Sequence, residues 1–163
     1  MAQVSISLGS NIDRERNLRA AVARLRETYG RLLLSPVYQT AAVGFNGDDF
    51  LNLVACMETA QAPAIVVERL KSIEDELGRD RSQPKFSARR IDLDLLTYDD
   101  MVGDGAGFQV PRDEILYNAF VLKPMADVMR DQVHPVSGKT YRQLWDKMAE
   151  KGVRIERVAL DLG

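Results

Sequence analysis

The alternation of apolar and polar residues predicts strands separated by amphipathic helices in the N-terminal part of the chain. Val4 to Leu8 alternates strictly, as a half-buried strand does, and Gly9-Ser10-Asn11 ends it. Apolar residues recur every three or four positions from Asn17 to Tyr29, which predicts a helix that stops at Gly30. A second helix with an apolar stripe is expected to begin at Pro63.

The remaining segments are also typical of regular elements. Three apolar runs have the composition of strands, namely Leu32 to Tyr38, Phe50 to Glu58 and Ile91 to Tyr98. Asp99 to Gly107 is polar and glycine-bearing, which predicts a loop. Beyond it we expect a short helical segment from Pro111, helices at Phe120 to Val128 and Tyr141 to Lys151, and a last strand at Val153 to Leu160.

The order of the first elements is strand, helix, strand, strand, helix, strand, which is the ferredoxin-like plan. This order predicts an α+β fold in which helices pack on one face of an antiparallel sheet. The later helices are placed to cover the second face, giving α/β/α layers. We expect residues 1–163 to form a single domain, because this length is usual for one.

Composition argues against several classes of protein. The net charge is -2, with acids and bases interspersed, whereas a nucleic-acid surface would carry a basic excess. The single cysteine, Cys56, excludes an internal disulfide. Neither a signal peptide nor an apolar run long enough to span a membrane is found. Since no conspicuous exposed apolar stripe is seen either, we expect a monomeric, cytoplasmic protein.

The sharpest chemical feature is the carboxylate pair in Asp92-Leu93-Asp94. Residues two apart on a strand share a face, so Asp92 and Asp94 lie side by side. Ile91, Leu93 and Leu95 then face the other way. Adjacent carboxylates repel each other, and Mg²⁺, usually held by one or two carboxylates plus substrate phosphates, relieves that repulsion. Taken alone, the pattern fits better a solvated face whose acids pair with arginines.

A group of basic residues directly upstream favours the metal interpretation. Its members are Arg79, Arg81, Lys85, Arg89 and Arg90. Guanidinium groups bind phosphate oxygens with two parallel hydrogen bonds and keep their charge at any working pH. Acids for a metal beside arginines for phosphates meet the needs of polyphosphate transfer, which depends on positioning and charge neutralisation. A basic loop solvated at the surface remains the alternative for these arginines.

Two further features have both a functional and a structural interpretation. Glu74 either reaches Arg89 or a metal-bound water, or lies on a solvated helix face, which is the better interpretation of Glu76. Phe50 and Asn52 share one strand face, where they could stack on and hydrogen-bond a flat heterocycle. Core packing accounts for this pair equally well.

These residues also carry a family resemblance that covers nearly the whole chain. The chain resembles the 6-hydroxymethyl-7,8-dihydropterin pyrophosphokinases of folate biosynthesis. The likeness rests on ordered segments, namely Ser7-Leu8-Gly9-Ser10-Asn11, Ser35-Pro36-Val37-Tyr38-Gln39-Thr40, Phe50-Leu51-Asn52, Ile73-Glu74 with Gly78-Arg79-Asp80-Arg81, Arg89-Arg90-Ile91-Asp92-Leu93-Asp94, and Val110-Pro111-Arg112. The string Arg89-x-x-Asp92-x-Asp94 is the most specific of them.

The resemblance implies that a pterin hydroxymethyl oxygen attacks the β-phosphorus of ATP and that AMP leaves. It implies two Mg²⁺ ions held by Asp92 and Asp94, which with Arg81 and Arg89 form the catalytic centre. The implied ATP-binding residues are Glu74, Arg79, Arg81, Arg89, Leu95 and Arg112. The implied pterin-binding residues are Thr40, Ala41, Val43, Phe50, Asn52 and Phe120. ATP and a dihydropterin are thus the expected partners, with neither nucleic acid nor membrane.

Three positions depart from the family pattern near the expected phosphates. Arg112 and Asp113 stand where the family usually has His and often Tyr, and Asn118 stands where it commonly has an arginine. Two alternatives therefore stay open. One is a catalytically weakened homologue that binds a pterin as a partner or regulatory module. The other is a different Mg²⁺-dependent phosphoryl or nucleotidyl transferase on the same fold.

Overall fold

The order of helices and strands follows the expected plan closely. A computed structural model describes residues 1–40, 49–78 and 91–163. The elements are β1 (Ala2–Ser10), α1 (Arg14–Tyr29), β2 (Leu33–Leu34), β3 (Val37–Thr40), β4 (Phe50–Thr59), α2 (Pro63–Glu76), β5 (Asp92–Tyr98), β6 (Gly103–Gly105), β7 (Phe108–Val110), a 3-10 turn η1 (Asp113–Leu116), α3 (Ala119–Val128), α4 (Tyr141–Glu150) and β8 (Glu156–Val158). No helix within these ranges is long and apolar enough to cross a membrane.

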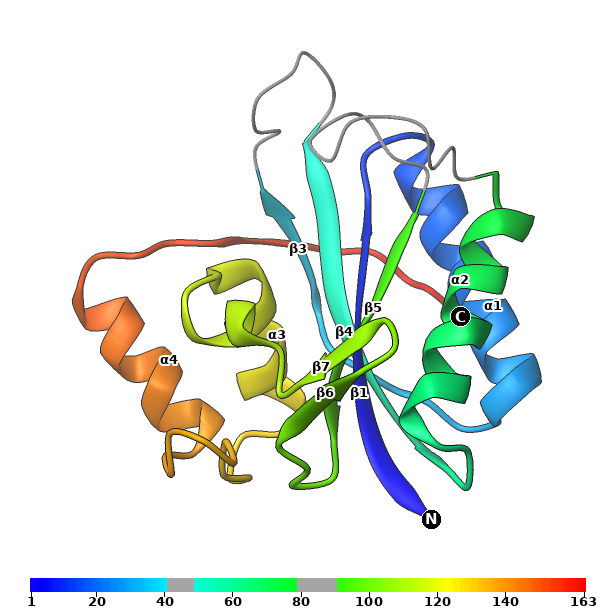
Figure 1. Ribbon diagram of the computed structural model, residues 1–163. Helices are drawn as coiled ribbons and strands as arrows, with labels where there is room; N and C mark the ends of the chain where they lie inside the picture. Colours follow the sequence, from blue (N-terminus) through cyan, green and yellow to red (C-terminus); the bar gives the residue numbers. More distant parts are fainter. Residues whose placement is uncertain (41–48, 79–90) are drawn as a thin grey trace.

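The main sheet is antiparallel, with the spatial strand order β5-β1-β4-β3-β8 and with β2 paired to β4 (Figure 1). β1 lies between β5, at one edge of the sheet, and β4, at its centre. A β-α-β-β-α-β chain order that builds such a sheet is the ferredoxin-like arrangement, so the predicted fold class is confirmed. β8 extends the sheet beyond that plan by pairing with β3.

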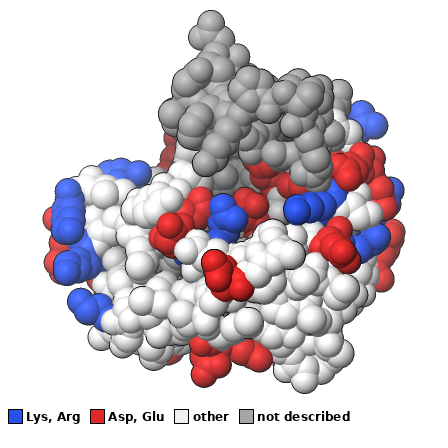
Figure 2. All heavy atoms as spheres, viewed as in Figure 1, with Lys and Arg blue, Asp and Glu red and all other residues white. Residues whose placement is uncertain are grey.

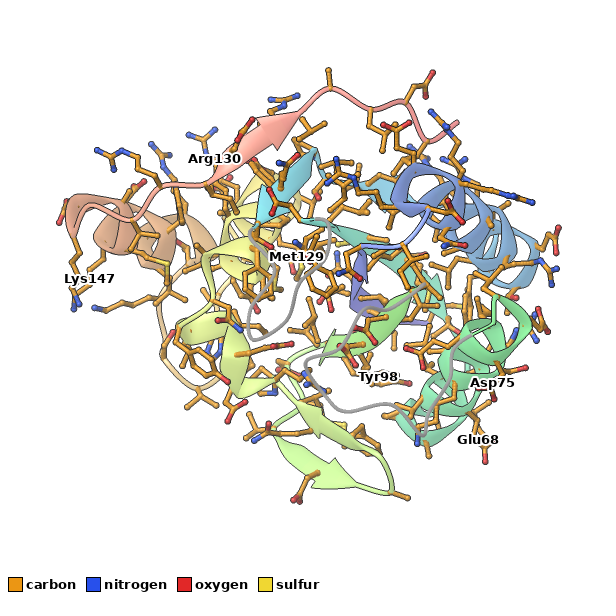
Figure 3. The ribbon with its side chains drawn as sticks, turned by 90° about the horizontal axis from the view of Figure 1, so that it is seen from above. Glu68, Asp75, Tyr98, Met129, Arg130 and Lys147 are labelled. Atoms are coloured by element: carbon orange, nitrogen blue, oxygen red, sulfur yellow. The ribbon has the colours of Figure 1, made fainter. Side chains whose placement is uncertain are left out.

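Helices cover both faces of the sheet, which confirms the three expected layers (Figure 1). On one face α1 and α2 bury an apolar cluster that includes Ile6, Leu18 and Leu70. On the other face α3 and α4 bury a second cluster that includes Val54 and Met125. Figure 3 looks down on these layers, with Glu68 and Asp75 of α2 on one side and Lys147 of α4 on the other.

The local sequence explains where the helices begin and end. α1 buries Leu18, Ala21, Val22 and Leu25, the stripe expected from their spacing. Gly30 follows it at φ 80°, a conformation that a residue without a side chain adopts at little cost. α4 begins with a capping box in which Thr140 and Gln143 satisfy each other's backbone N–H groups.

Three predicted elements differ from the structure. The strand expected at Leu32 to Tyr38 is split into β2 and β3, because Ser35-Pro36 interrupts it. Pro36 has no N–H to donate to a neighbouring strand. At this break the Val54 N–H of β4 donates to the Ser35 hydroxyl, at 2.9 Å, rather than to a backbone carbonyl. The final strand is only Glu156–Val158, shorter than the range Val153 to Leu160 that its alternation predicted.

The segment predicted as a loop, Asp99 to Gly107, contributes β6 to a two-stranded hairpin with β7. The hairpin forms because Phe108 packs against the cluster beneath α2 and lies directly over Gly105. A Cβ atom at Gly105 would come within 2.7 Å of the Phe108 ring. Gly107 lies in the turn of the hairpin, but Gly103 and Gly105 are strand residues, so the loop prediction is wrong for them. The close packing on Phe108 that makes a strand of this segment has no signature in the sequence.

Candidate active site

One end of the sheet brings residues from four neighbouring strands into a row. Asp92 of β5 lies opposite Gly9 of β1, which in turn lies opposite Asn52 of β4. Asn52 also lies opposite Tyr38 of β3. Residues paired across strands project from the same face, and here that face is covered by α3, where the Tyr38 hydroxyl hydrogen-bonds the Asp127 carboxylate.

The two carboxylates of β5 lie on this face, as their spacing predicted. Asp94 lies opposite Ser7 of β1, and its side chain is 42% exposed. Leu93 and Leu95 point the opposite way and are buried in the cluster beneath α1 and α2. Figure 2 shows acidic and basic side chains side by side near the centre of the molecular face seen in that view.

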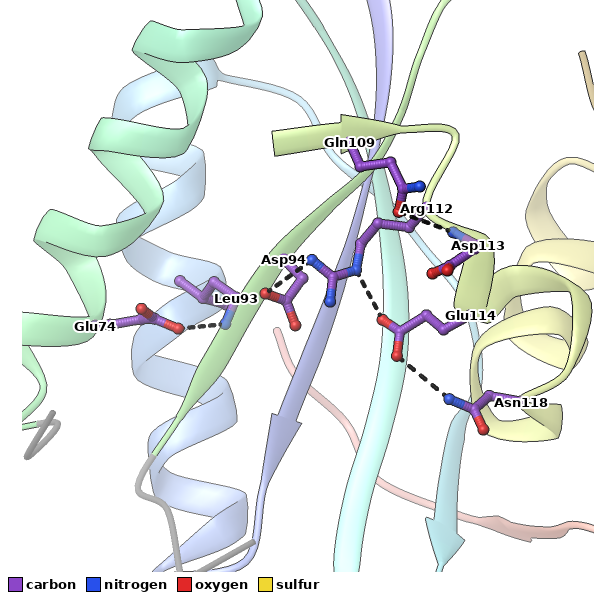
Figure 4. A network of polar contacts seen from close by, with 8 residues as sticks. All are labelled: Glu74, Leu93, Asp94, Gln109, Arg112, Asp113, Glu114 and Asn118. Atoms are coloured by element: carbon purple, nitrogen blue, oxygen red, sulfur yellow. Dashed lines mark hydrogen bonds and ion pairs between the residues drawn. The ribbon is translucent and has the colours of Figure 1, made fainter. Parts of the chain in front are cut away.

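Glu74 of α2 supports this strand from behind. Its side chain is buried, and its Oε2 accepts a hydrogen bond from the Leu93 N–H at 2.8 Å (Figure 4). The solvated-face interpretation is therefore wrong for Glu74. It is correct for Glu76, which pairs at the surface with Arg24 and Arg69. Glu74 thus fixes the backbone of the one residue that separates the two carboxylates.

Arg112 reaches toward the carboxylate pair from the segment between β7 and η1 (Figure 4). Its Nη1 lies 3.9 Å from Asp94 Oδ1, and its Nε donates a hydrogen bond to Glu114 Oε1 at 3.1 Å. Partial burial lowers the pKa of Arg112, but the charges of Asp94, Glu114 and Asp113 outweigh that effect and raise it. The guanidinium is therefore a permanent positive charge beside the acids.

Asn118 and Asp113, the other two departures from the family pattern, lie near this arginine. Asn118 Nδ2 donates to the second carboxylate oxygen of Glu114, Oε2, at 3.3 Å. The Asp113 N–H donates to Gln109 Oε1 at 3.5 Å, so the backbone of Asp113 rather than its charge makes this contact. Glu114 consequently bridges Arg112 and Asn118 with its two oxygens (Figure 4).

Three of the predicted pterin residues that the structure describes, Thr40, Phe50 and Asn52, come together at the same end of the sheet. Asn52 is buried, and its Nδ2 donates to Thr40 Oγ1 at 3.0 Å. Phe50 is half-buried and lies opposite Thr40 in the β3–β4 pairing. Phe120, in the first turn of α3, packs partly buried against the second apolar cluster. An amide edge and two aromatic rings are what a flat, hydrogen-bonding heterocycle requires.

Several predicted residues are not tested by the structure. Arg79, Arg81, Arg89, Ala41 and Val43 lie outside the described ranges. The side chain of Leu95 is 4% exposed in the cluster beneath α1 and α2, so a contact with ATP at this position would fall to its backbone.

The described part of the chain holds no group of three or more His, Cys, Asp or Glu side chains arranged for a metal ion. The donor set on β5 is the carboxylate pair Asp92 and Asp94. This set fits Mg²⁺, which is usually held by one or two carboxylates together with substrate phosphates and water rather than by a closed protein cage.

Two residues of this site were missed in the sequence. Gly9 lies directly opposite Asn52 on the adjacent strand, and a Cβ at Gly9 would come within 2.9 Å of Asn52 Oδ1. A glycine at the end of an alternating strand is a recognisable signal for such a close approach. Glu114 offered no signal, because one acid among several in a short helical turn is ordinary at a protein surface.

His134, the only histidine of the sequence, lies in the turn before α4. It is buried, and its Nδ1 accepts hydrogen bonds from the N–H groups of Val136 and Ser137 at 3.2 and 3.0 Å. Burial lowers its pKa. A neutral imidazole that accepts hydrogen bonds from the backbone of a turn has a structural role.

Comparison with known proteins identifies relatives for nearly the whole chain. The family model for 7,8-dihydro-6-hydroxymethylpterin-pyrophosphokinase matches residues 5–130. A 2-amino-4-hydroxy-6-hydroxymethyldihydropteridine pyrophosphokinase of Methylorubrum extorquens is 34% identical over 97% of this chain and 99% of its own length. One from Synechocystis is 32% identical, with 97% of this chain and 82% of the relative covered.

Some relatives are much longer. The folic acid synthesis protein fol1 of Schizosaccharomyces pombe is 32% identical over 92% of this chain, which spans only 21% of that protein. The fold is also similar to that of the HPPK-DHPS protein of Plasmodium falciparum, with a TM-score of 0.70, 15% identity, and coverage of 93% of this chain and 44% of that one.

Proposed function

The chain belongs to the 7,8-dihydro-6-hydroxymethylpterin-pyrophosphokinase family, and we propose that it transfers pyrophosphate from ATP to 6-hydroxymethyl-7,8-dihydropterin in folate biosynthesis. In this reaction a bond forms between the hydroxymethyl oxygen and the β-phosphorus of ATP. The bond from that phosphorus to the bridging α-phosphate oxygen breaks, AMP leaves, and the hydroxyl proton is lost to solvent. The observation that carries the proposal is the position of the carboxylate pair on the sheet. Only Gly9 of β1 lies between Asp92 and Asn52, which is hydrogen-bonded to Thr40.

Asp92 and Asp94 are the residues that would hold Mg²⁺, and the family resemblance implies two ions. When bound, Mg²⁺ neutralises polyphosphate charge and favours ionisation of the attacking hydroxyl. Arg112 would contact the ATP phosphates, together with Arg79, Arg81 and Arg89, and Glu74 would keep β5 in place behind them. Transfer of this kind depends on positioning and electrostatics rather than on covalent help from the protein.

The pterin would bind at the other end of the row. Asn52 and Thr40 would read its hydrogen-bonding edge, with Ala41 and Val43 contributing from the adjoining segment. Phe50 and Phe120 would contact its faces, since aromatic rings stack on flat heterocycles. The hydroxymethyl group would then point along the row toward Asp92 and Asp94.

The test is AMP formation from ATP and Mg²⁺, measured with and without 6-hydroxymethyl-7,8-dihydropterin. We expect AMP only when the pterin is present. AMP formed only with a non-pterin acceptor would instead favour another Mg²⁺-dependent transferase.

A second candidate function is a pterin-binding homologue with weakened catalysis. It is favoured by one observation, the positively charged Arg112 side chain 3.9 Å from Asp94, where the family usually has a histidine. Pterin binding by calorimetry without AMP formation would support this candidate. Turnover would exclude it.

We further propose that the protein is a monomer, a single domain and cytoplasmic, as composition suggests. Light scattering coupled to size exclusion checks the first point: a mass near 18.3 kDa is expected.

A further inference from the structure

The two carboxylates that flank Arg112 hold it in different ways. Its Nε is hydrogen-bonded to Glu114 at 3.1 Å, whereas its Nη1 lies 3.9 Å from Asp94 Oδ1, beyond hydrogen-bond distance. The Arg112 side chain is 36% exposed, and that of Glu114 is 19% exposed. The guanidinium is thus anchored at Glu114 and only attracted electrostatically by Asp94.

The anchor is itself well fixed. The Arg112 N–H donates to the Leu96 carbonyl of β5 at 2.9 Å, so the main chain of Arg112 is attached two residues beyond Asp94. Asn118 occupies the second oxygen of Glu114 at 3.3 Å. Glu114 thus holds the Nε side of the guanidinium at the site (Figure 4). Its Nη1 is not hydrogen-bonded to Asp94, so a small rotation of the side chain is enough to carry it to another anionic partner.

We propose that Arg112 is a placeholder for the metal at Asp94, and that Glu114 is the residue that positions it. Without ligands the guanidinium partly neutralises Asp94. A divalent cation that binds the Asp94 carboxylate displaces the guanidinium of Arg112 from it. The guanidinium, still hydrogen-bonded to Glu114, then contacts the phosphates of the nucleotide. This inference rests on the proposed function, because it takes a metal–nucleotide complex as the ligand.

Such an exchange couples the binding of metal and nucleotide. A metal that binds alone separates Arg112 from Asp94, and the guanidinium gains no other anion in exchange. A metal that binds together with a polyphosphate supplies the phosphates as a new anionic partner for Arg112. The coupling is reciprocal, so each ligand strengthens binding of the other by the same factor. Asp94, Glu114 and Arg112 thereby make the site bind the metal–nucleotide complex more tightly than the metal alone.

The experiment measures binding and needs no turnover. Mn²⁺ is titrated into the protein by electron paramagnetic resonance, alone and with an ATP analogue carrying a methylene bridge between the α- and β-phosphorus. In Arg112→Met we expect Mn²⁺ alone to bind about three- to tenfold more tightly, the size of effect that removing a partly exposed charge produces. The analogue with Mn²⁺ should bind more weakly by a similar factor.

The chain offers a matched control in Arg142, whose Nε lies 4.0 Å from Asp146 on the exposed side of α4. Arg142→Met should change neither affinity. The positioning role is tested by Glu114→Ala, which should weaken binding of the analogue, and by Glu114→Gln, which keeps an acceptor for Nε and should largely restore it. Rescue by glutamine separates anchoring from a general effect of the negative charge.

Both affinities moving in the same direction in Arg112→Met, or neither moving, would overturn the proposal. Such a result, with pterin-dependent AMP formation intact in the wild type, would leave the proposed function standing. Opposite movement in a protein that forms no AMP would support the placeholder role and refute the function.

Discussion

At the scale of single residues, the carboxylate of Asp94 has the sharpest expected role. It faces the site, it lies next to the guanidinium of Arg112, and its neighbours Leu93 and Leu95 hold β5 in the core. Since its side chain is 42% exposed, it contributes little to packing. Its loss should therefore affect the reaction and spare the fold.

We expect Asp94→Ala to reduce pyrophosphate transfer by about a thousandfold or more, because an electrostatic contact to the reacting phosphates is lost. The measurement is pterin-dependent AMP formation, with the melting temperature as the check on folding. Asp146→Ala, which removes an exposed acid of α4, serves as the control and should leave the rate unchanged. Retained activity in Asp94→Ala would refute the assigned metal site.

Gly9 gives a second expectation at this scale. In Gly9→Ala the new methyl group would come within 2.9 Å of Asn52 Oδ1 and push the amide away from Thr40. We expect the KM for the pterin to rise about tenfold, corresponding to roughly one lost hydrogen bond, while the KM for ATP stays constant. Gly103→Ala is the control, because nothing lies within 4 Å of its Cβ position. Equal effects on both substrates would contradict this role.

Prediction from sequence worked for residues whose role follows from strand geometry. Asp92 and Asp94 share a face because the alternation of a strand allows nothing else. Glu74 and Glu114 show the limit: whether an acid on a helix is buried or solvated depends on what packs against it, and the sequence does not show the partner. Arg112 was expected near phosphates, but its hydrogen bond to Glu114, two residues along the chain, depends on side-chain directions that the sequence does not show.

At the scale of elements, a hydrogen bond between Glu74 of α2 and Leu93 of β5 joins the helix to the strand that carries the carboxylate pair. Glu74 lies on the inner face of α2 and bonds the backbone N–H of Leu93. Glu76, two residues later, lies on the outer face and pairs with the surface arginines Arg24 and Arg69. The two acids therefore provide a comparison within one helix.

We expect Glu74→Ala to lower the free energy of unfolding by about 1–3 kcal/mol, because the buried Leu93 N–H loses its acceptor. Glu76→Ala should cost less than about 1 kcal/mol, as exposed ion pairs do. Urea unfolding followed by circular dichroism measures both. Similar costs for the two variants would mean that the Glu74–Leu93 bond does not tie helix to strand.

Elements whose limits depend on their own residues were predicted well, and those that depend on contacts were not. The apolar stripe and Gly30 predict α1, and Pro63 predicts the start of α2. By contrast, the β6–β7 hairpin forms because Phe108 finds a place against the cluster beneath α2. Pro36 was a sequence signal for the break between β2 and β3, but the apolar residues on either side of it led to the prediction of one continuous strand.

At the scale of the whole molecule, we expect His134, in the second layer of helices, to contribute to acid sensitivity. His134 lies in the connection between α3 and α4, and its ring contacts Tyr141 edge to face at 6.0 Å. Nδ1 accepts two backbone N–H groups and so carries no proton, which places the proton on Nε2. Nε2 is buried without a hydrogen-bond partner among the described residues.

Because the pKa of His134 is lowered in the folded state, folding favours the neutral ring. Its contribution to stability is complete above the unfolded pKa of about 6.5 and is lost as pH falls below that value. We expect unfolding free energies, measured in urea from pH 7.5 to 5, to decline below pH 6.5 by at most about 1.4 kcal/mol per pH unit for this one group.

The matched variant is His134→Asn, whose side-chain oxygen can accept the same backbone N–H groups in a turn but does not titrate. It should be less stable than the wild type at pH 7.5 and show a shallower decline toward pH 5. An identical slope in both proteins would show that carboxylates elsewhere, rather than His134, govern acid sensitivity.

The direction of β1 has a practical consequence for handling the protein. The strand runs from Ala2, beside an exposed Met1, to Ser10 at the end of the sheet that carries Asp92 and Asn52. Nine strand residues span about 30 Å. A tag, fluorophore or linker attached at Met1 would therefore lie at the end of the sheet opposite the candidate active site. Protein immobilised through Met1 should keep that site open to bulk solution.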